Sequence, residues 1–151
     1  TRKESSAASD VYKRQVYNEV FLDKQNLERM FGCQITGMAY PYGTYNDEVV
    51  QILKKCKIQY ARSVVSSGAF KLQKNLLIFK PTCHHADENI WELLEKFLKE
   101  KSEEKQLFYI WGHSYEFDVN NNWKRMEEIL DRLIGHNNIF YGTNREVLLP
   151  C

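Results

Sequence analysis

No apolar run in this 151-residue sequence reaches the roughly 18–20 residues that are needed to span a bilayer. An excess of charge is also lacking, because 21 Lys and Arg residues stand against 20 Asp and Glu residues and the formal net charge is +1. A dedicated nucleic-acid binder usually carries a strongly basic face, so the sequence argues against that class. The 43% hydrophobic and 27% charged residues are typical of one globular domain with a core of its own.

Closely spaced cysteines are lacking as well. The four cysteines are Cys33, Cys56, Cys83 and Cys151, and no two of them form a C-x-x-C pair. A zinc knuckle or a dithiol redox motif is therefore not expected. We expect four free thiols, in a reducing compartment or in an anaerobe, and a disulfide is the open alternative.

Residues 1–15 differ from the rest of the chain. They are mostly small and polar, and they lack an apolar period of 2 or 3.6. Residues 5–15 resemble a translated adapter sequence that recurs at the ends of assembled reading frames, and an ordinary disordered terminus is the alternative. We therefore expect residues 1–15 to be a disordered or artefactual segment and residues 16–151 to hold the domain, with the authentic gene beginning further upstream.

Predicted helices and strands alternate from residue 16 onward. Helices are expected before Gly32, after Asn46, after Asp87, over residues 126–134, and from the capping box that begins at Thr143. Strands are expected at residues 35–40, 58–65, 76–79, 107–111 and 139–141. This alternation predicts an α/β fold with a parallel sheet or barrel and right-handed crossovers.

Two segments directly follow predicted strands, which is where parallel α/β folds place their chemistry. Gly112-His113-Ser114 offers an imidazole that can exchange a proton near neutral pH. In Pro41-Tyr42-Gly43 the chain turns, and the outward backbone N–H of Tyr42 is suited to stabilise an oxyanion. The alternatives are a hydrogen-bonded structural histidine and a plain strand-to-helix turn.

Five segments follow one another along the chain at plausible spacing. They are Tyr40-Pro41-Tyr42-Gly43, Tyr60-Ala61-Arg62, Pro81-Thr82-Cys83-His84-His85, Trp111-Gly112-His113-Ser114-Tyr115-Glu116-Phe117 and Tyr141-Gly142-Thr143-Asn144-Arg145-Glu146. This succession resembles the C-terminal part of NodB-type polysaccharide deacetylases (carbohydrate esterase family 4). The resemblance covers residues 16–148 and implies a partial distorted (β/α) barrel whose N-terminal strands are missing.

The resemblance also implies a function. Enzymes of this family are metal-dependent hydrolases that remove acetyl groups from polysaccharides or amino-sugar polymers. Their divalent metal, usually zinc, is held by an aspartate and two histidines, and a second aspartate acts as general base. The resemblance assigns the backbone N–H of Tyr42 to the oxyanion hole and His113 to the general acid. From their side chains and their positions beside the two motifs, we expect substrate contacts for Tyr40, Pro41, Trp111 and His84.

The departures from the family pattern concern the metal. The Asp-Asp motif and the His-x-x-x-His motif of the family are absent, so we expect this chain to bind no metal and to be inactive alone. Ala39 stands where the family has an arginine before Pro-Tyr-Gly, and Arg62 is a candidate replacement. A partial barrel would also leave open strand edges, which predicts marginal stability or self-association.

Other interpretations remain open for the same residues. Adjacent histidines on an extended strand point to opposite faces, so only one of His84 and His85 is expected to join a given site. A small zinc site formed by Cys83, His84 and His113 is one alternative. A non-catalytic carbohydrate-binding or degenerate deacetylase-like module is the main rival, because sugar rings stack on aromatic side chains. The aromatic residues near the two motifs are Tyr40, Tyr42, Trp111, Tyr115, Phe117 and Trp123.

Overall fold

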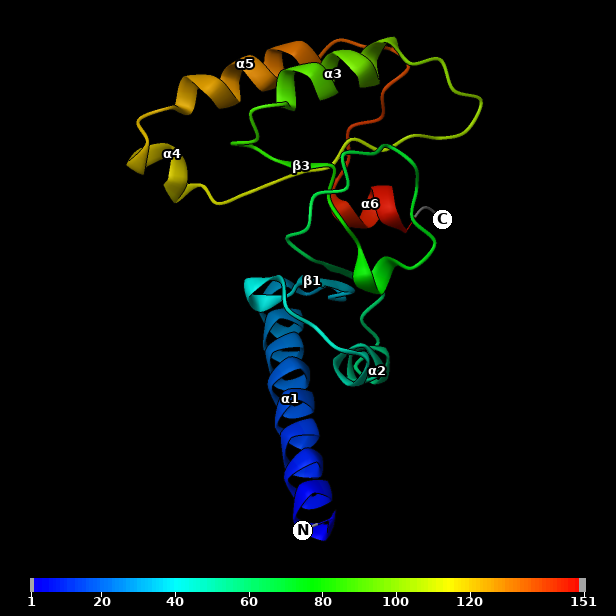
Figure 1. Cartoon of the computed structure of the whole chain (residues 1–151), viewed down its shortest axis with the longest axis vertical. Coiled ribbons are helices and arrows are strands. Elements are labelled where there is room, and N and C mark those ends of the chain that lie inside the picture. Colours follow the sequence, from blue (N-terminus) through cyan, green and yellow to red (C-terminus); the bar gives the residue numbers. More distant parts are fainter. Residues whose placement is uncertain (1, 150–151) are drawn as a thin grey trace. The chain divides into compact units, whose positions relative to one another are not determined.

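The computed structural model describes residues 2–149, which divide into two compact units (Figure 1). Within the described residues, unit 1 comprises residues 2–63, 75–79 and 143–149, and unit 2 comprises residues 64–74 and 80–142. Within residues 2–149, none of the helices combines the length and the apolar character that crossing a membrane requires.

Unit 1 begins with the helix α1, Arg2–Phe31, drawn in blue in Figure 1. The predicted helix before Gly32 is therefore present, and it extends without interruption through residue 15. Gly32 ends it with a φ of 64° and a backbone N–H that donates to Glu28 O at 2.9 Å, which is the usual way a glycine closes a helix. The placement of a domain boundary after residue 15 stays a prediction.

A strand–helix–strand segment forms the centre of unit 1. The strands β1 (Gly37–Ala39) and β2 (Tyr60–Arg62) pair in parallel, and the helix α2 (Asp47–Lys55) lies between them in the chain. The side chain of Asn46 caps α2 by accepting from the N–H of Val49 at 2.9 Å, as its position predicts. The buried core of unit 1 comprises Tyr40, Val50, Ile52, Leu53, Cys56, Ile58, Ala61 and Leu77.

The prediction of a strand at residues 76–79 was wrong. Leu76–Ile78 forms the short 3₁₀ helix η2, because the side chain of Asn75 accepts from the N–H of Leu77 at 3.2 Å and so favours a turn. Only Phe79 makes a bridge, parallel to Arg62. The predicted helix after Thr143 is present as α6, Asn144–Leu148, with a complete capping box.

Unit 2 contains a second strand–helix–strand segment. The strands β3 (Cys83–His84) and β4 (Ile110–Trp111) pair in parallel, and the helix α3 (Ile90–Lys99) lies between them in the chain. The helices α4 (Tyr115–Val119) and α5 (Trp123–Leu133) follow, and α3 and α5 lie side by side (Figure 1). The buried core of this unit comprises Cys83, Ile90, Leu94 and Ile129.

The parallel pairing is confirmed, the prediction of a strand at residues 139–141 was wrong, and the partial barrel stays a prediction. Residues 139–141 form no strand; the side chains of Phe140 and Tyr141 are exposed, and the Tyr141 hydroxyl donates to Leu133 O instead. Within residues 2–149 the strands form two separate two-stranded sheets and no closed barrel. The fold is therefore mixed α/β, compatible with part of a larger domain.

The cysteines of the described residues are free thiols. Cys33 is exposed, and Cys56 and Cys83 are buried in the cores of unit 1 and unit 2. Cys151 lies outside the described residues.

Candidate functional site

The Pro41–Gly43 turn of unit 1 forms the short 3₁₀ helix η1 directly after β1. Tyr42 adopts φ 53° and ψ 12°, a left-handed conformation that costs a residue with a side chain about 1–2 kcal/mol. Its side chain is 94% exposed. Hydrogen bonds hold the turn, from Gly43 N to Tyr40 O at 2.9 Å and from Thr44 N to Pro41 O at 3.2 Å. A strained, exposed residue of this kind is more frequent at functional sites than elsewhere.

Tyr40 lies in the core of unit 1. Its hydroxyl donates to Leu77 O at 2.7 Å, and its ring stacks on Tyr45 with 4.9 Å between the centroids. Burial raises the pKa of Tyr40 to about 12. The structure thus gives Tyr40 a packing role, while Pro41 is exposed in the turn. The sugar contacts of Tyr40 and Pro41, like the oxyanion role of the Tyr42 N–H, stay predictions.

In unit 2, the parallel pairing of β3 and β4 brings two chemically active segments to one sheet edge. His84 lies opposite Trp111, so His85 and Gly112-His113 both follow the carboxyl ends of their strands. The backbone N–H of His85 donates to Trp111 O at 2.9 Å and extends the pairing by one residue. This is the position where α/β sheets place their ligands.

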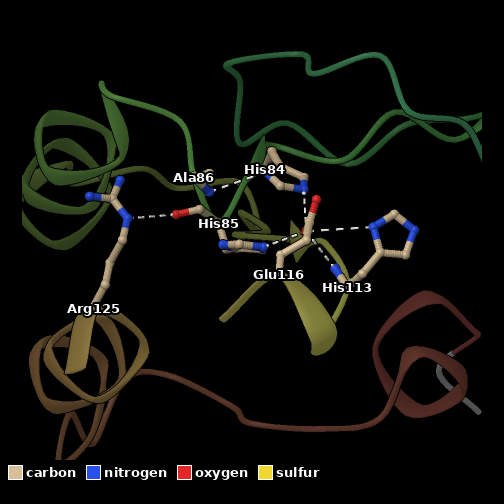
Figure 2. Close-up of polar contacts among 6 residues, drawn as sticks. All are labelled: His84, His85, Ala86, His113, Glu116 and Arg125. Carbon is tan, nitrogen blue, oxygen red and sulfur yellow. Dashed lines mark hydrogen bonds and ion pairs between the residues drawn. The ribbon is translucent and has the colours of Figure 1, made fainter. Parts of the chain in front are cut away.

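The carboxylate of Glu116, in the first turn of α4, is the centre of this edge (Figure 2). Its Oε2 atom lies 2.7 Å from His85 Nε2 and 3.2 Å from His84 Nε2. The same oxygen accepts from the backbone N–H of His113 at 3.0 Å and lies 3.5 Å from His113 Nδ1. We refer to His84, His85 and Glu116 as the His–Glu cluster; His113 borders it.

The charges of the His–Glu cluster follow from these contacts. The N–H of His113, together with the hydrogen bond from His85, lowers the pKa of Glu116 to about 2. Burial, and next the neighbouring His85, lower the pKa of His84. At neutral pH, Glu116 is therefore ionised and His84 is neutral.

Both histidines of the cluster face the same carboxylate, so the expectation that only one could join a site was wrong. The side chains of neighbouring residues alternate only within a strand, and β3 ends at His84. The chain then turns, and the N–H of Asp87 donates to His84 O at 3.0 Å. The ring centroids of His84 and His85 lie 4.2 Å apart. The ring centroids of His84 and Trp111 lie 4.5 Å apart in an edge contact. The ring of His84 is also held by the N–H of Ala86, which donates to Nδ1 at 3.1 Å.

His85 is 2% exposed and is fixed on several sides. Arg125 donates from Nε to His85 O at 3.0 Å (Figure 2). It also donates from Nη2 to Asp87 O at 2.7 Å. The imidazole packs 4.2 Å from the ring of Phe117. Its Nδ1 atom is buried and has no hydrogen-bond partner among the described residues.

Gly112 leaves the space that the two histidines fill. A Cβ atom at this position would lie 1.9 Å from His85 Cδ2 and 3.1 Å from His84 Nε2. Its φ of 155° is also one that residues with a side chain rarely adopt. The site therefore requires glycine here for two independent reasons.

Comparison with known families gives one match. Residues 6–61 match the polysaccharide deacetylase family. The matched segment contains the Pro41–Gly43 turn, begins before residue 16, and ends before the His–Glu cluster. The predicted resemblance to the deacetylases is thus confirmed for this part of the chain. No curated protein and no solved structure matches the chain significantly.

The deacetylase family is metal-dependent in general, and its ligand motifs are not in this sequence. The chain has neither an Asp-Asp pair nor a His-x-x-x-His spacing, so it does not supply the donors that the resemblance implies. The donors that the structure does bring together are different ones, the two imidazoles and one carboxylate of the His–Glu cluster.

The predicted site residues separate between the units. His84, Trp111 and His113 lie together in unit 2, whereas Tyr40, Pro41 and Tyr42 belong to unit 1. Two residues of the cluster, His85 and Glu116, were not predicted as site residues. The spacing between His113 and Glu116 was an available signal, because residues three apart become neighbours at the start of a helix.

The alternative zinc set of Cys83, His84 and His113 does not match the arrangement found. Cys83 is fully buried in the core of unit 2, away from the donors of the cluster. Burial raises the pKa of the Cys83 thiol to about 11, so this thiol is protonated at neutral pH in the metal-free chain.

Proposed function

We propose that this chain is part of a polysaccharide deacetylase, a metal-dependent hydrolase that removes acetyl groups from an amino-sugar polymer. The family match over residues 6–61 carries the proposal, because it contains a strained, exposed turn at the end of a parallel strand. Deacetylation is an acyl transfer to water, and it needs a stabilised oxyanion and a proton for the leaving group. The chain contains candidates for both.

Tyr42 is the candidate for the oxyanion. Its backbone N–H would donate to the carbonyl oxygen of the acetyl group as negative charge develops there. The left-handed conformation of Tyr42 supports this role, because strain of this kind persists where a backbone group must be held in one direction. A preorganised donor stabilises the transition state more than the substrate, which is the condition for catalysis.

His113 is the candidate for the general acid, which would protonate the sugar amine or hydroxyl as it leaves. Its side chain is 52% exposed, and its Nδ1 lies 3.5 Å from the ionised carboxylate of Glu116. A metal held by the ligand motifs of the family, which this chain lacks, would supply an activated water and would polarise the carbonyl.

The substrate of the proposal is an acetylated sugar chain. Trp111 and His84 border the general acid, so they are the candidates in unit 2 for contacts with a sugar ring. Pro41 and Tyr40 are the corresponding candidates in unit 1, with the exposed Pro41 the better placed of the two.

The test is an assay of acetate release from acetylated chitooligosaccharides. The protein translated from the full upstream reading frame is expected to release acetate with zinc, and the 151-residue chain alone is expected to release none. A full-length protein that carries both upstream motifs and deacetylates no acetylated sugar polymer would contradict the proposed function. Turnover by the chain alone would contradict the need for the family's metal motifs.

A non-catalytic carbohydrate-binding or degenerate deacetylase-like module is the second candidate. Exposed aromatic side chains in unit 2 favour it, since Tyr115 is 61% and Trp123 is 48% exposed. Affinity electrophoresis in gels that contain chitin oligomers or xylan separates the two functions. If the chain is a binding module, the gel should retard the 151-residue chain, and Trp123→Ala should abolish the retardation. The upstream part of the gene should then lack the metal motifs.

A further inference from the structure

We propose that His84, His85 and Glu116 form a binding site for one divalent transition-metal ion, with zinc as the expected ion. The site differs from the Asp and His-x-x-x-His set that the family resemblance implies, and all its ligands belong to unit 2. It does not depend on deacetylase activity, so either proposal can fail without the other.

The donor atoms already converge on one point. One ligand atom from each of the three residues lies within 4.8 Å of the other two. Two of the three separations are 2.7 Å and 3.2 Å. Ligand atoms around a tetrahedral zinc ion, with bonds of about 2.0–2.1 Å, lie roughly 3.3 Å apart. Small shifts of these side chains would therefore admit the ion.

The chemistry of the donors selects the class of ion. Two imidazoles and one carboxylate form a known set for zinc, in which a fourth position stays open to water or substrate. Imidazole suits zinc, cobalt and nickel, whereas magnesium and calcium prefer sites made of oxygen atoms.

The surroundings hold these donors in place. Arg125 fixes the backbone of His85, and the absence of a side chain at Gly112 gives both imidazoles their space. The buried Nδ1 of His85 has no partner among the described residues, so the hydrogen-bond network alone leaves this ring unsatisfied. A site this well fixed loses little conformational entropy when it takes up an ion.

A purely structural hydrogen-bond network is the competing account. In that account, the N–H of Ala86 donates to His84 Nδ1, and the neutral ring therefore carries its proton on Nε2 and points it at Glu116. An ion at Nε2 would require the proton to move to Nδ1, and the hydrogen bond from Ala86 would break. The amide of Ala86 therefore reports which of the two arrangements exists.

The first experiment measures bound metal by equilibrium dialysis and elemental analysis. It uses the whole 151-residue chain without an affinity tag, stripped with chelator, in a Cys33→Ser, Cys151→Ser background that removes competing thiols. We expect one Zn²⁺ per chain, visible absorption of tetrahedral Co²⁺, and no such binding of Mg²⁺. His84→Ala and Glu116→Gln should each weaken Zn²⁺ binding by about 100-fold or more, since even loss of a supporting residue costs 10–100-fold.

The matched control is His136→Ala, which removes the other histidine of unit 2 that lies outside the cluster and its neighbour His113. This variant should keep the affinity of the parent chain. Folding of each variant is checked by circular dichroism, and His84 is preferred to the more deeply buried His85 for substitution. Zinc binding that is absent, or that His84→Ala and Glu116→Gln leave unchanged, would overturn the site.

The second experiment follows the amide of Ala86 by ¹H–¹⁵N NMR during titration with Zn²⁺. Metal binding predicts a large shift of the Ala86 amide and faster hydrogen exchange at this position, saturating at one equivalent. An Ala86 amide that does not change while zinc binds elsewhere would show that the network is structural only, and would overturn the proposal.

Discussion

The Oε2 atom of Glu116 lies 2.7 Å from Nε2 of His85, across 31 residues of chain. The same atom accepts from the backbone N–H of His113, so one carboxylate ties the segment after β3 to the segment after β4. The general-acid candidate His113 and both adjacent histidines therefore contact the same charged group. Charge-assisted hydrogen bonds of this kind are stronger than neutral ones.

In the metal-free chain, the stability difference between the parent and Glu116→Gln should depend on pH. The folded pKa of Glu116 is about 2, below its ordinary value of 4.5, so its contribution is present above pH 4.5 and is lost as the pH falls toward 2. At pH 7 the variant should lose roughly 1.5–3 kcal/mol of unfolding free energy, as expected for hydrogen bonds to a charged group. Urea denaturation from pH 7 to pH 3 should show the difference from the parent chain shrinking.

The control for that measurement is Glu103→Gln, at an exposed glutamate of the same unit. The unfolding free energy of this variant should stay within about 0.5 kcal/mol of the parent value over the whole pH range. A difference between Glu116→Gln and the parent that does not change with pH would contradict the assigned hydrogen bonds.

Gly112→Ala should destabilise unit 2 strongly, because the added Cβ would overlap the ring of His85. We expect a loss of about 2–4 kcal/mol, which combines overpacking with backbone strain. Gly135→Ala is the matched control, since Gly135 also has a positive φ, of 81°, but no atom within 4 Å of the position of its Cβ. Gly135→Ala should lose only about 1–2 kcal/mol in denaturant titrations. Equal losses in the two variants would show that the two histidine rings do not occupy the space beside Gly112.

The cysteines should react at very different rates with iodoacetamide in the native protein. Cys33 is exposed, whereas Cys56 and Cys83 are buried, and burial raises the pKa of both buried thiols. Only the thiolate reacts, so Cys33 should be alkylated at least about 100-fold faster than Cys83 at pH 8. Peptide mapping by mass spectrometry gives the order, and denatured protein, in which the rates should converge, is the control. Similar alkylation rates of Cys33 and Cys83 in the native protein would contradict the burial of Cys83 in the core of unit 2.

The elements that could be predicted from the sequence are those with strong local signals. Asn46 and Thr143 cap their helices as expected, because a short polar side chain can satisfy the first free N–H groups without help from tertiary contacts. The parallel pairing also followed from the alternation of apolar runs and amphipathic helices. The run at 76–79 misled because its apolar character fits a buried 3₁₀ turn as well as a strand, and the Asn75 cap decided between them.

The candidate site was predicted only in part, for a related reason. His113 and His84 were found because glycine and apolar runs mark the ends of strands. His85 was set aside by a rule that holds only inside a strand, and β3 ends one residue before it. The convergence of Glu116 on three histidines depends on the pairing of β3 with β4, which joins segments far apart in the chain and has no local sequence signal.

Two variants of a deacetylase that contains this chain would separate the catalytic roles that we propose for the two strand ends. His113→Ala should lower kcat by about 10²- to 10⁴-fold, the usual effect of losing a general acid. Tyr42→Phe should leave kcat within about twofold of the parent, because an N–H donor on the backbone survives the substitution and an oxyanion hole depends on the donor. The exposed phenol of Tyr42 makes this a mild change for folding. Unchanged turnover in His113→Ala would show that another group protonates the leaving group, and a large loss in Tyr42→Phe would assign a role to the hydroxyl instead of the N–H.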